Sequence, residues 1–440
     1  MTRPAERRLA RSVPAHTGRP DAPADPPRRA AGRVLCVTSN FPRWEGDSTT
    51  PFVLHLAQDL QVLGWQVDVL APHAPGAARS ETLAGVRTER FRYAWPASAQ
   101  TVCYRGGAMI NLRKRPVEKL KLPVLVGAEL LAIYRRLLTR SYDIVHSHWI
   151  LPQGFTGTIA SRLAGVPHVV TVHGGDLFAL RGRTMSALKR LALARADAVT
   201  VNSSFTERGI SDLVPEQDKV RRIPMGVDVG LASKRSAERA HALRERHRRG
   251  AGPLLVTVGR LVEEKGVDDV IRAVDLLRDQ RPDVSLIVVG EGQDRGALEG
   301  LVAELGIGEH VRFLGWVEPD EVRACMAAAD AFVGASRTGP DGWVEAQGLT
   351  FLESMAVGTP VVATRLGGIV DSVEDGETGL LVNERAPEEI AEAVGRIIHE
   401  PDLAPRLVAA ASLRVRASFS REASAASFAE LFSSVSGEGR

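Results

Sequence analysis

Two carboxylates, Glu345 and Glu353, bracket the start of a predicted helix in the segment EAQGLTFLESMAVGTP. Apolar residues at helical spacing begin after Gly348, while Gly358 and Pro360 mark the end of the helix. Free backbone N–H groups at a helix N-terminus bind phosphate well. A diphosphate there leaves both carboxylates able to accept hydrogen bonds from sugar hydroxyls. The pattern predicts a nucleotide-sugar site, with a core helix between two solvated acids as the alternative.

A pair of cations follows the strand predicted at residues 254–259. Arg260 and Lys265 lie in the loop GRLVEEKG. Both side chains can bind a diphosphate beyond the edge of the sheet. The arginine guanidinium can donate two parallel hydrogen bonds, and the lysine ammonium acts as a point charge. Further on, VVGEGQDRGALE places Gly290 and Gly292 in a spacing that is not a dinucleotide fingerprint.

Histidines end two strands predicted in the first half of the chain. His146 and His148 lie two residues apart, so both point to one face of their strand. A metal site needs a third ligand, and none follows at a useful spacing. We expect the pair to line the acceptor side with Trp149 and Asp176, unless one of the two histidines packs in the core. His173 opens HGGD, which ends at Asp176 and whose two glycines allow close backbone approach; a structural histidine is the alternative.

The loop after the first predicted strand, NFPRWEGDSTTP, is a further candidate. Thr50 can cap the next helix, and Pro51 suits its first turn. Gly46 would let a phosphate or a sugar approach the backbone. A plain surface loop is the alternative, although its place after a strand favours function.

Short β-branched runs alternate with helical segments from Arg33 onward, which indicates parallel sheets. Two series of such runs predict two doubly wound, Rossmann-like α/β domains, and ligands bind beyond the carboxyl ends of such strands. The first series of expected strands comprises residues 34–39, 67–72, 143–148, 168–173 and 198–203. The second series comprises residues 254–259, 285–290, 311–315, 331–336, 360–364 and 379–382.

The chain divides at changes in composition. Residues 1–32 are rich in Arg, Pro and Ala without the apolar segment of a secretory signal, so we expect a disordered tail. A transit peptide is the alternative, although prolines would break its helix. Residues 224–253 contain Pro, Gly and the charged run ALRERHRRG, which predicts a linker. The two domains are then residues 33–223 and 254–415.

Composition narrows the class of protein. The chain has 440 residues, of which 44% are hydrophobic and 25% charged, as in ordinary globular proteins. Its net charge of +3 is too small to indicate binding to nucleic acid. Three scattered cysteines suit a reducing cytosol, and no apolar run approaches the ~20 residues that span a membrane. We therefore predict a cytoplasmic protein. The basic amphipathic stretch at residues 101–123 could rest on the inner face of an anionic bilayer, or be a solvated helix face.

The segment from Glu345 resembles the Glu-x7-Glu signature of the retaining glycosyltransferases of family 4, which have the two-domain GT-B fold. The usual form is EGFGLxxLEAMAxGxPVVA, and here Ala346 replaces its glycine. GRLVEEKG matches the motif GRLxxxKG, and HGGD and VVGEGQDRGALE match further family segments. ATRLGGIVD resembles the GGxxE turn, with Asp371 in the acidic position. The resemblance spans residues 33–435.

The resemblance implies a GT-B fold whose two domains face each other across a cleft. The first domain takes the acceptor and the second the nucleotide sugar, and a C-terminal helix near residues 416–435 crosses back onto the first. Glu345 then lies near the anomeric carbon, His173 beside the donor sugar, and Glu353 at the ribose. The remaining expected donor contacts are Arg260, Lys265, Gly259, Gly290, Gly292, Gly46 and the amides of Gly348, Leu349 and Thr350.

We therefore predict a retaining hexosyltransferase that uses a nucleoside-diphosphate sugar and a glycan, lipid-linked or small-molecule acceptor. Cell-surface polysaccharide or glycoconjugate biosynthesis is the expected setting. The chain has no Asp-x-Asp motif, so no essential metal and no other cofactor are expected. The alternatives are a GT-B epimerase or phosphorylase, and a binding protein without catalysis. The sequence does not specify the base, the sugar, the acceptor, the linkage or the oligomeric state.

Overall fold

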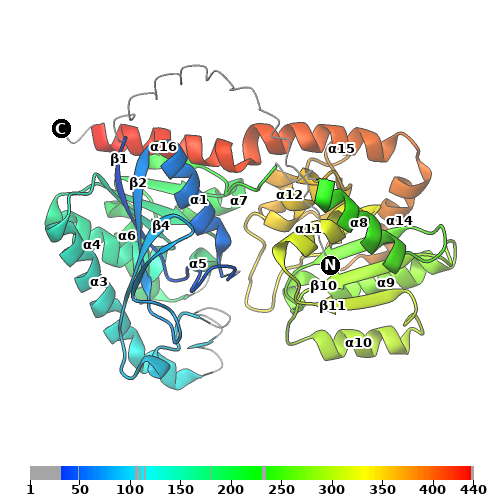
Figure 1. The fold of residues 1–440 in the computed structure, drawn as a ribbon, viewed down its shortest axis with the longest axis horizontal. Coiled ribbons are helices and arrows are strands. Elements are labelled where there is room, and N and C mark those ends of the chain that lie inside the picture. The colour runs from blue at the N-terminus through cyan, green and yellow to red at the C-terminus, as the bar shows by residue number, and fades with distance from the viewer. Residues whose placement is uncertain are drawn as a thin grey trace, which may run out of the picture.

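The computed structural model describes residues 31–437, apart from 48, 105–107, 109–110, 113–114, 179 and 230–233. The predicted tail therefore lies outside the described residues as far as residue 30, and the first strand already begins at Gly32. Two units, each built on its own sheet, lie side by side (Figure 1). The protein thus has the two-domain α/β architecture that the strand series predicted.

The first unit contains an eight-stranded sheet in the order β3-β4-β2-β1-β5-β6-β7-β8, in which β3 alone runs antiparallel to its neighbour. Buried β-branched runs such as HVVTV in β6 are typical of parallel strands covered on both faces. The chain winds outward in both directions from the β1–β5 pair, which makes this pair the topological switch point. The strands are β1 Gly32–Val37, β2 Trp65–Pro72, β3 Ser80–Leu83, β4 Val86–Phe91, β5 Ile144–His148, β6 His168–Val172, β7 Ala198–Val201 and β8 Val220–Arg222.

Three strands of this sheet, β3, β4 and β8, were not predicted. β3 is the edge strand SETL, of which only Leu83 is buried, whereas β4, VRTERF, pairs with both β2 and β3 and buries the polar residues Thr88 and Arg90. β8 is only three residues long, and two of them are exposed. Edge strands are half solvated, so they lack the continuous apolar run by which the central strands are recognised.

The second unit contains a six-stranded, wholly parallel sheet in the order β11-β10-β9-β12-β13-β14. Its switch point lies between β9 and β12. All six strands were predicted, with ends that differ from the observed ones by at most two residues. They are β9 Leu254–Val258, β10 Ser285–Val289, β11 Val311–Gly315, β12 Ala331–Gly334, β13 Val361–Thr364 and β14 Leu380–Val382.

Helices cover both faces of each sheet. In the first unit α1 and α16 pack on one face, and α3, α4 and α6 on the other. In the second unit α9, α10 and α14 pack on one face, and α8, α11 and α12 on the other. The helices are α1 Pro51–Val62, α3 Leu122–Thr139, α4 Phe155–Ala164, α5 Gly175–Phe178, α6 Arg183–Arg195, α7 Ser204–Ile210, α8 Lys234–His247, α9 Val267–Arg278, α10 Arg295–Glu304, α11 Pro319–Ala328, α12 Leu349–Ala356, α13 Ile369–Ser372, α14 Pro387–His399, α15 Leu403–Arg414 and α16 Arg421–Gly437.

The segment predicted as a linker, residues 224–253, contains helix α8, Lys234–His247. Ala240 and Leu243 are buried in the core of the second unit. Arg244 donates to the carbonyl oxygen of Ala328 at 2.7 Å and pairs with Asp330. In the charged sequence of α8, Ala240 and Leu243 form a narrow apolar stripe, which is enough to pack the helix against the second unit.

The C-terminal helix α16 lies on the first unit, along the top of the molecule in Figure 1. Arg421 at its start forms an ion pair with Asp59 of α1 at 2.7 Å. Phe428 and Phe432 are fully buried against the first sheet. The two units are therefore joined through this helix as well as through the chain between β8 and β9.

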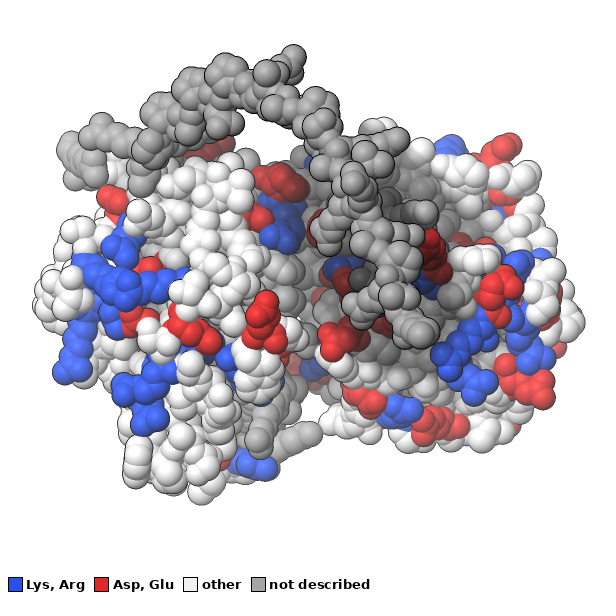
Figure 2. Space-filling model, viewed as in Figure 1, with Lys and Arg blue, Asp and Glu red and all other residues white. Residues whose placement is uncertain are grey.

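On the face drawn in Figure 2, acidic and basic side chains are interspersed over both units. Among the described residues, none of the helices has the length and apolar character required to cross a bilayer.

Candidate active site

The loops after β9 and β12 meet at the switch point of the second sheet. A Cβ at Gly266 would come within 2.0 Å of the Ala335 carbonyl oxygen, so only glycine permits this approach. The backbone N–H of Arg337 donates to the Glu264 carbonyl at 2.9 Å. Its guanidinium, which is nearly buried, donates to Asp268 at 3.0 Å. These contacts fix the two loops against each other.

Lys265 and Glu345 form an ion pair across these two loops. Their side chains are only 21% and 14% exposed. The Lys265 ammonium also lies 5.3 Å from the centre of the Trp343 ring, within the range of a cation–π contact. The two residues were predicted separately, from motifs eighty positions apart, and the structure brings them into direct contact.

The backbone of Glu345 is held by a turn at Gly367 and Gly368. The N–H of Gly368 donates to the Glu345 carbonyl oxygen at 2.9 Å. A Cβ at Gly367 would come within 2.1 Å of the same oxygen. From the sequence this GG turn is known only by its resemblance to the GGxxE turn. The glycine pair itself was the available signal that a neighbouring backbone approaches closely.

Helix α12 begins directly after Gly348, as predicted, and Gly348 has a φ of +77°. The backbone N–H groups of Leu349 and Thr350 lie in its first turn, where an anion is stabilised. The buried side chains include Phe351, which packs edge-on against Phe332 at 5.5 Å, whereas Leu349 is only partly buried. The predicted apolar face therefore extends further around the helix than helical spacing indicated.

Glu353 lies half-buried on α12. Burial raises the pKa of its carboxyl to about 7, although the nearby charge of Arg323 acts in the opposite direction. None of the described residues donates a hydrogen bond to this carboxylate. A carboxyl group in this state can accept hydrogen bonds from a ligand once it ionises.

Arg260 is exposed, and within the described part of the chain it has no ion pair. The two glycines after β10 serve a packing role: a Cβ at Gly290 would meet the Gly259 carbonyl oxygen at 1.9 Å, and one at Gly292 would meet the Leu261 carbonyl oxygen at 2.0 Å. They let the β10 loop lie directly on the β9 loop.

On the first unit, His173 follows β6 and lies beside His148 at the end of β5, with 3.0 Å between His148 Nδ1 and His173 Nε2. Asp176 accepts hydrogen bonds from the backbone N–H of His173 at 3.1 Å and of Ile150 at 2.7 Å. Trp149 packs against His173 with 4.9 Å between ring centres. Burial lowers the pKa of His173 to about 3, so its ring is neutral at physiological pH.

His146 packs in the core, the alternative left open for one member of the pair. Its ring lies against Phe428 and Phe432 of α16, and its Nε2 is 2.7 Å from Thr171 Oγ1. His146 and His148 do share one face of β5, but α16 covers that face at His146. The described residues contain no group of three or more side chains arranged to hold a metal ion.

The β1–α1 loop differs in part from the prediction. Thr50 has a left-handed backbone and does not cap α1 with its side chain. Its hydroxyl donates instead to the Asn40 carbonyl at 2.9 Å. Gly46 lies on the exposed part of the loop with open space around it. Phe52, at the start of α1, was not predicted, yet its ring lies 5.2 Å from that of His173.

The carboxyl ends of the two sheets meet at the site. A Cβ at Gly174, directly after His173, would come within 2.3 Å of the Ala346 Cβ, directly after Glu345. Ser204, at the start of α7, donates through its hydroxyl to Asp371 of α13 at 2.7 Å, and its backbone N–H donates to the same carboxylate. These contacts set the His173 side of one unit opposite the Glu345 side of the other.

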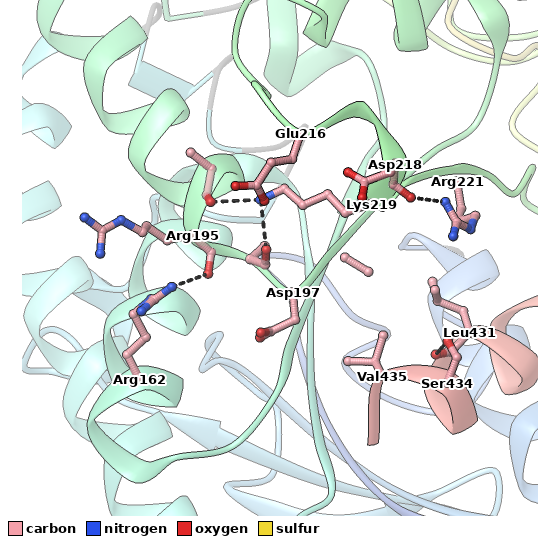
Figure 3. Close-up of a pocket in the computed structure, with 13 residues that line it drawn as sticks. Arg162, Arg195, Asp197, Glu216, Asp218, Lys219, Arg221, Leu431, Ser434 and Val435 are labelled. Carbon is pink, nitrogen blue, oxygen red and sulfur yellow. Dashed lines mark hydrogen bonds and ion pairs between the residues drawn. The ribbon is translucent and has the colours of Figure 1, made fainter. Parts of the chain in front are cut away.

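A cavity of about 620 Å³ lies elsewhere, at the amino ends of β7 and β8 and beside the end of α16 (Figure 3). Lys219 in its wall donates to the carbonyl oxygens of Ala194 and Ala196 at 2.8 and 3.1 Å. Doubly wound sheets bind ligands at the opposite end of their strands. We therefore assign this cavity no part in the site.

The basic stretch at residues 101–123 is described only in part: Arg105, Arg113 and Lys114 lie outside the described residues. In the described part, Val117 and Leu120 are exposed.

Comparisons with known proteins agree with this geometry. Residues 240–414 match the family described as glycosyl transferases group 1, and residues 49–226 match the glycosyl transferase 4-like domain. The fold matches that of sucrose-phosphate synthase from Thermosynechococcus elongatus, with a TM-score of 0.73 and 25% identity over 91% of this chain and 98% of that one. The fold and the facing loops thus define a glycosyltransferase of the GT-B type.

Two curated relatives extend the match. A D-inositol 3-phosphate glycosyltransferase of Pseudarthrobacter chlorophenolicus is 32% identical over 76% of this chain and 82% of its own length. A GDP-mannose-dependent alpha-(1-6)-phosphatidylinositol monomannoside mannosyltransferase of Mycolicibacterium smegmatis is 35% identical over 57% of this chain, but the match spans only 65% of that relative. The chain belongs to the group 1 glycosyltransferases, the family 4 type that its motifs resemble.

Proposed function

We propose that this glycosyltransferase moves a hexose from a nucleoside-diphosphate donor to its acceptor with retention of configuration. The observation that carries the proposal is the Lys265–Glu345 pair, which lies beside the start of α12 and opposite His173. A departing diphosphate requires positive charge, and a transferred sugar requires acceptors for its hydroxyls. Lys265 supplies the positive charge and Glu345 the hydrogen-bond acceptor, side by side.

In this proposal Lys265, Arg260 and the first amides of α12 stabilise the charge that develops on the diphosphate. Glu345 accepts hydrogen bonds from the sugar near its anomeric carbon, and Glu353 accepts them from the ribose. A retaining hydrolase instead uses a free carboxylate as a nucleophile. Glu345 is already paired with an ammonium, so we propose a front-face displacement without a covalent glycosyl-enzyme. The same cations make an essential metal or other cofactor unnecessary.

The donor and the acceptor are proposed from the names of the relatives. One is GDP-mannose-dependent and acts on a phosphatidylinositol mannoside, and the other acts on D-inositol 3-phosphate. We therefore propose GDP-mannose as the first donor to test, with acceptors that carry inositol or a lipid. Such products belong to glycoconjugate or cell-surface polysaccharide synthesis.

A lipid-linked acceptor would bring this protein, which we place in the cytoplasm, to the inner face of the membrane. Val117 and Leu120 lie in the 3-10 helix Pro116–Lys121 that leads into α3, and Val124 lies in the first turn of α3; their side chains are 65%, 77% and 56% exposed. Lys119 is exposed beside them. We propose that this surface rests on anionic lipid. The contact is supported if the natural protein floats with anionic but not with neutral vesicles and the Leu120→Ser variant does not float. Equal flotation of the natural protein and the Leu120→Ser variant with anionic vesicles contradicts it.

The reaction is tested by incubating the full chain with GDP-mannose and with UDP, ADP and TDP sugars, each with and without acceptor. Formation of a glycoside whose anomeric configuration by NMR equals that of the donor supports the proposal. An inverted product contradicts retention. An epimerised donor, or a sugar phosphate formed with added phosphate, would show a different reaction of the same fold. Glu345→Gln is the inactive control.

A further inference from the structure

The strongest arrangement that the proposed reaction does not yet use is the contact between the buried imidazole of His148 and the partly buried imidazole of His173. His148 is 1% exposed, and its Nδ1 lies 3.0 Å from the Nε2 of His173. The two rings are nearly parallel, at 17°. β5 and β6 are paired in parallel with His148 opposite Thr171, so His173 projects from the same carboxyl edge. The contact therefore follows from the register of the central strands.

Both rings are neutral, because burial lowers the pKa of His173 to about 3 and that of His148 well below its ordinary value. A neutral imidazole has one nitrogen that donates and one that accepts. A hydrogen bond between two such rings needs one proton between the facing nitrogens. With none or with two, lone pairs or N–H groups would oppose each other.

The place of that proton decides what His173 offers to a substrate. If His173 Nε2–H donates to His148, then His173 Nδ1 is an acceptor. If His148 Nδ1–H donates to His173, then His173 Nδ1 carries the proton and is a donor. The free edge of His173 is thus determined by its partner, as when a second hydrogen bond sets the tautomer of a functional histidine.

The orientation of the pair is held as well. Asp176 ties the backbone after β6 to the backbone after β5 through His173 N–H and Ile150 N–H. Phe52 and Trp149 pack against the His173 ring, with ring centres 5.2 and 4.9 Å away. Rotation of the imidazole out of the contact would displace these rings.

We propose that His148 is a positioning residue, which holds the orientation and the tautomer of His173 for contact with the donor sugar. The link to turnover rests on the proposed function, in which His173 lies beside that sugar. The tautomer itself can be measured without any activity.

The experiment compares His148→Leu with His148→Asn in the full chain labelled with ¹⁵N in its histidine rings. Long-range ¹H–¹⁵N correlation distinguishes a protonated ring nitrogen from a bare one, and His173→Asn assigns the signals. We expect a single His173 tautomer in the natural protein. His148→Leu should give a mixed or exchanged tautomer, whereas His148→Asn places an amide group near the position of Nδ1 and should preserve the single form.

Turnover at saturating donor should fall about tenfold in His148→Leu, with the donor KM little changed, and recover most of its value in His148→Asn. His168→Asn is the matched control. His168 is equally buried and bonds to Ser147 and Thr158 but not to His173, so its loss should lower Tm and leave the His173 signals unchanged.

An unchanged His173 tautomer in His148→Leu would overturn the proposal, as would equal losses of turnover in His148→Leu and His148→Asn. If His173→Ala keeps natural turnover while the tautomer still depends on His148, then the role of His173 in the reaction is wrong and the positioning of its ring is right.

Discussion

Replacement of Lys265 by methionine tests the cation at the centre of the proposed site. Methionine keeps most of the apolar stem that lies along the loop and removes the ammonium that pairs with Glu345. The free protein loses an ion pair whose two side chains are mostly shielded from water. Exposed pairs are worth about 0.2–1 kcal/mol, and breaking a buried one costs about 3–5 kcal/mol. We therefore expect a loss of about 1–2 kcal/mol in stability, between these limits.

The effect on the ligand should be larger than the effect on the fold. Loss of a charge-assisted contact to the diphosphate costs about 1.5–3 kcal/mol. This corresponds to roughly a 12- to 150-fold weaker affinity for the nucleoside diphosphate. Calorimetric titration measures that affinity directly, and kcat/KM with the same donor should fall by at least about tenfold.

The matched control is Arg272→Met. Arg272 lies exposed on α9, close in sequence to Lys265, and should change neither affinity nor stability. Arg260→Met should weaken diphosphate binding with little loss of stability, since Arg260 has no ion pair with any described residue. If Lys265→Met binds the nucleotide as tightly as the Arg272 control does, Lys265 does not contact the diphosphate and the site assignment is wrong.

Four further predictions concern the same site. Glu345→Gln should depress turnover with little loss of affinity for the nucleoside diphosphate, whereas Glu353→Gln should weaken nucleotide binding by about 1–3 kcal/mol. Calorimetric titration that gives the opposite pattern would reverse the roles of the two residues. Because the pKa of Glu353 is raised to about 7, its carboxylate forms above that pH, so affinity should rise from pH 6 to 8, more than in Glu353→Gln. Its contribution to stability should fall as the pH rises from 4.5, the ordinary pKa of the group, to about 7, since over that range the native state holds a proton that the unfolded state has lost. Activity in excess EDTA should stay within a few-fold of that with magnesium, and abolition that a divalent ion reverses would contradict this. Gly174→Ala should lower Tm and turnover, because the added Cβ would lie 2.3 Å from the Ala346 Cβ and the backbone φ of +91° is unfavourable for alanine. Adding Ala346→Gly to this variant should restore only part of the Tm and turnover, because about 1–2 kcal/mol of left-handed backbone strain remains.

The central strands and helix α12 could be predicted because their apolar runs are buried on both sides. Strands β3, β4 and β8 could not, because SETL, VRTERF and VRR are largely polar, and β4 buries polar side chains such as Arg90 inside the sheet. Helix α8 was missed for a related reason, since only Ala240 and Leu243 of its charged sequence reach the core. These strands and helix α8 are stabilised by contacts with residues far away in the chain, and such contacts cannot be inferred from local composition.

The candidate site shows the same limit. Glu345, Lys265 and His173 were found from motifs, but the Lys265–Glu345 pair depends on the order of β9 and β12 in the sheet. His146 and His148 could not be told apart by alternation along β5, since both lie on one face. Their difference comes from α16, nearly three hundred residues later, whose Phe428 covers one histidine and leaves the other beside His173.

Ala346 shows how the motifs depend on one another. The family form has glycine at this position, and here the methyl group points at Gly174 of the other unit. A side chain at both positions would place two Cβ atoms 2.3 Å apart, which no small rearrangement relieves. Gly174, the first glycine of HGGD, must therefore remain small because the Glu345 segment carries an alanine at position 346. The two motifs therefore constrain each other, because Gly174 and Ala346 meet where the two sheets face each other. This contact lies directly beside His173 and Glu345, the residues that we propose to contact the donor.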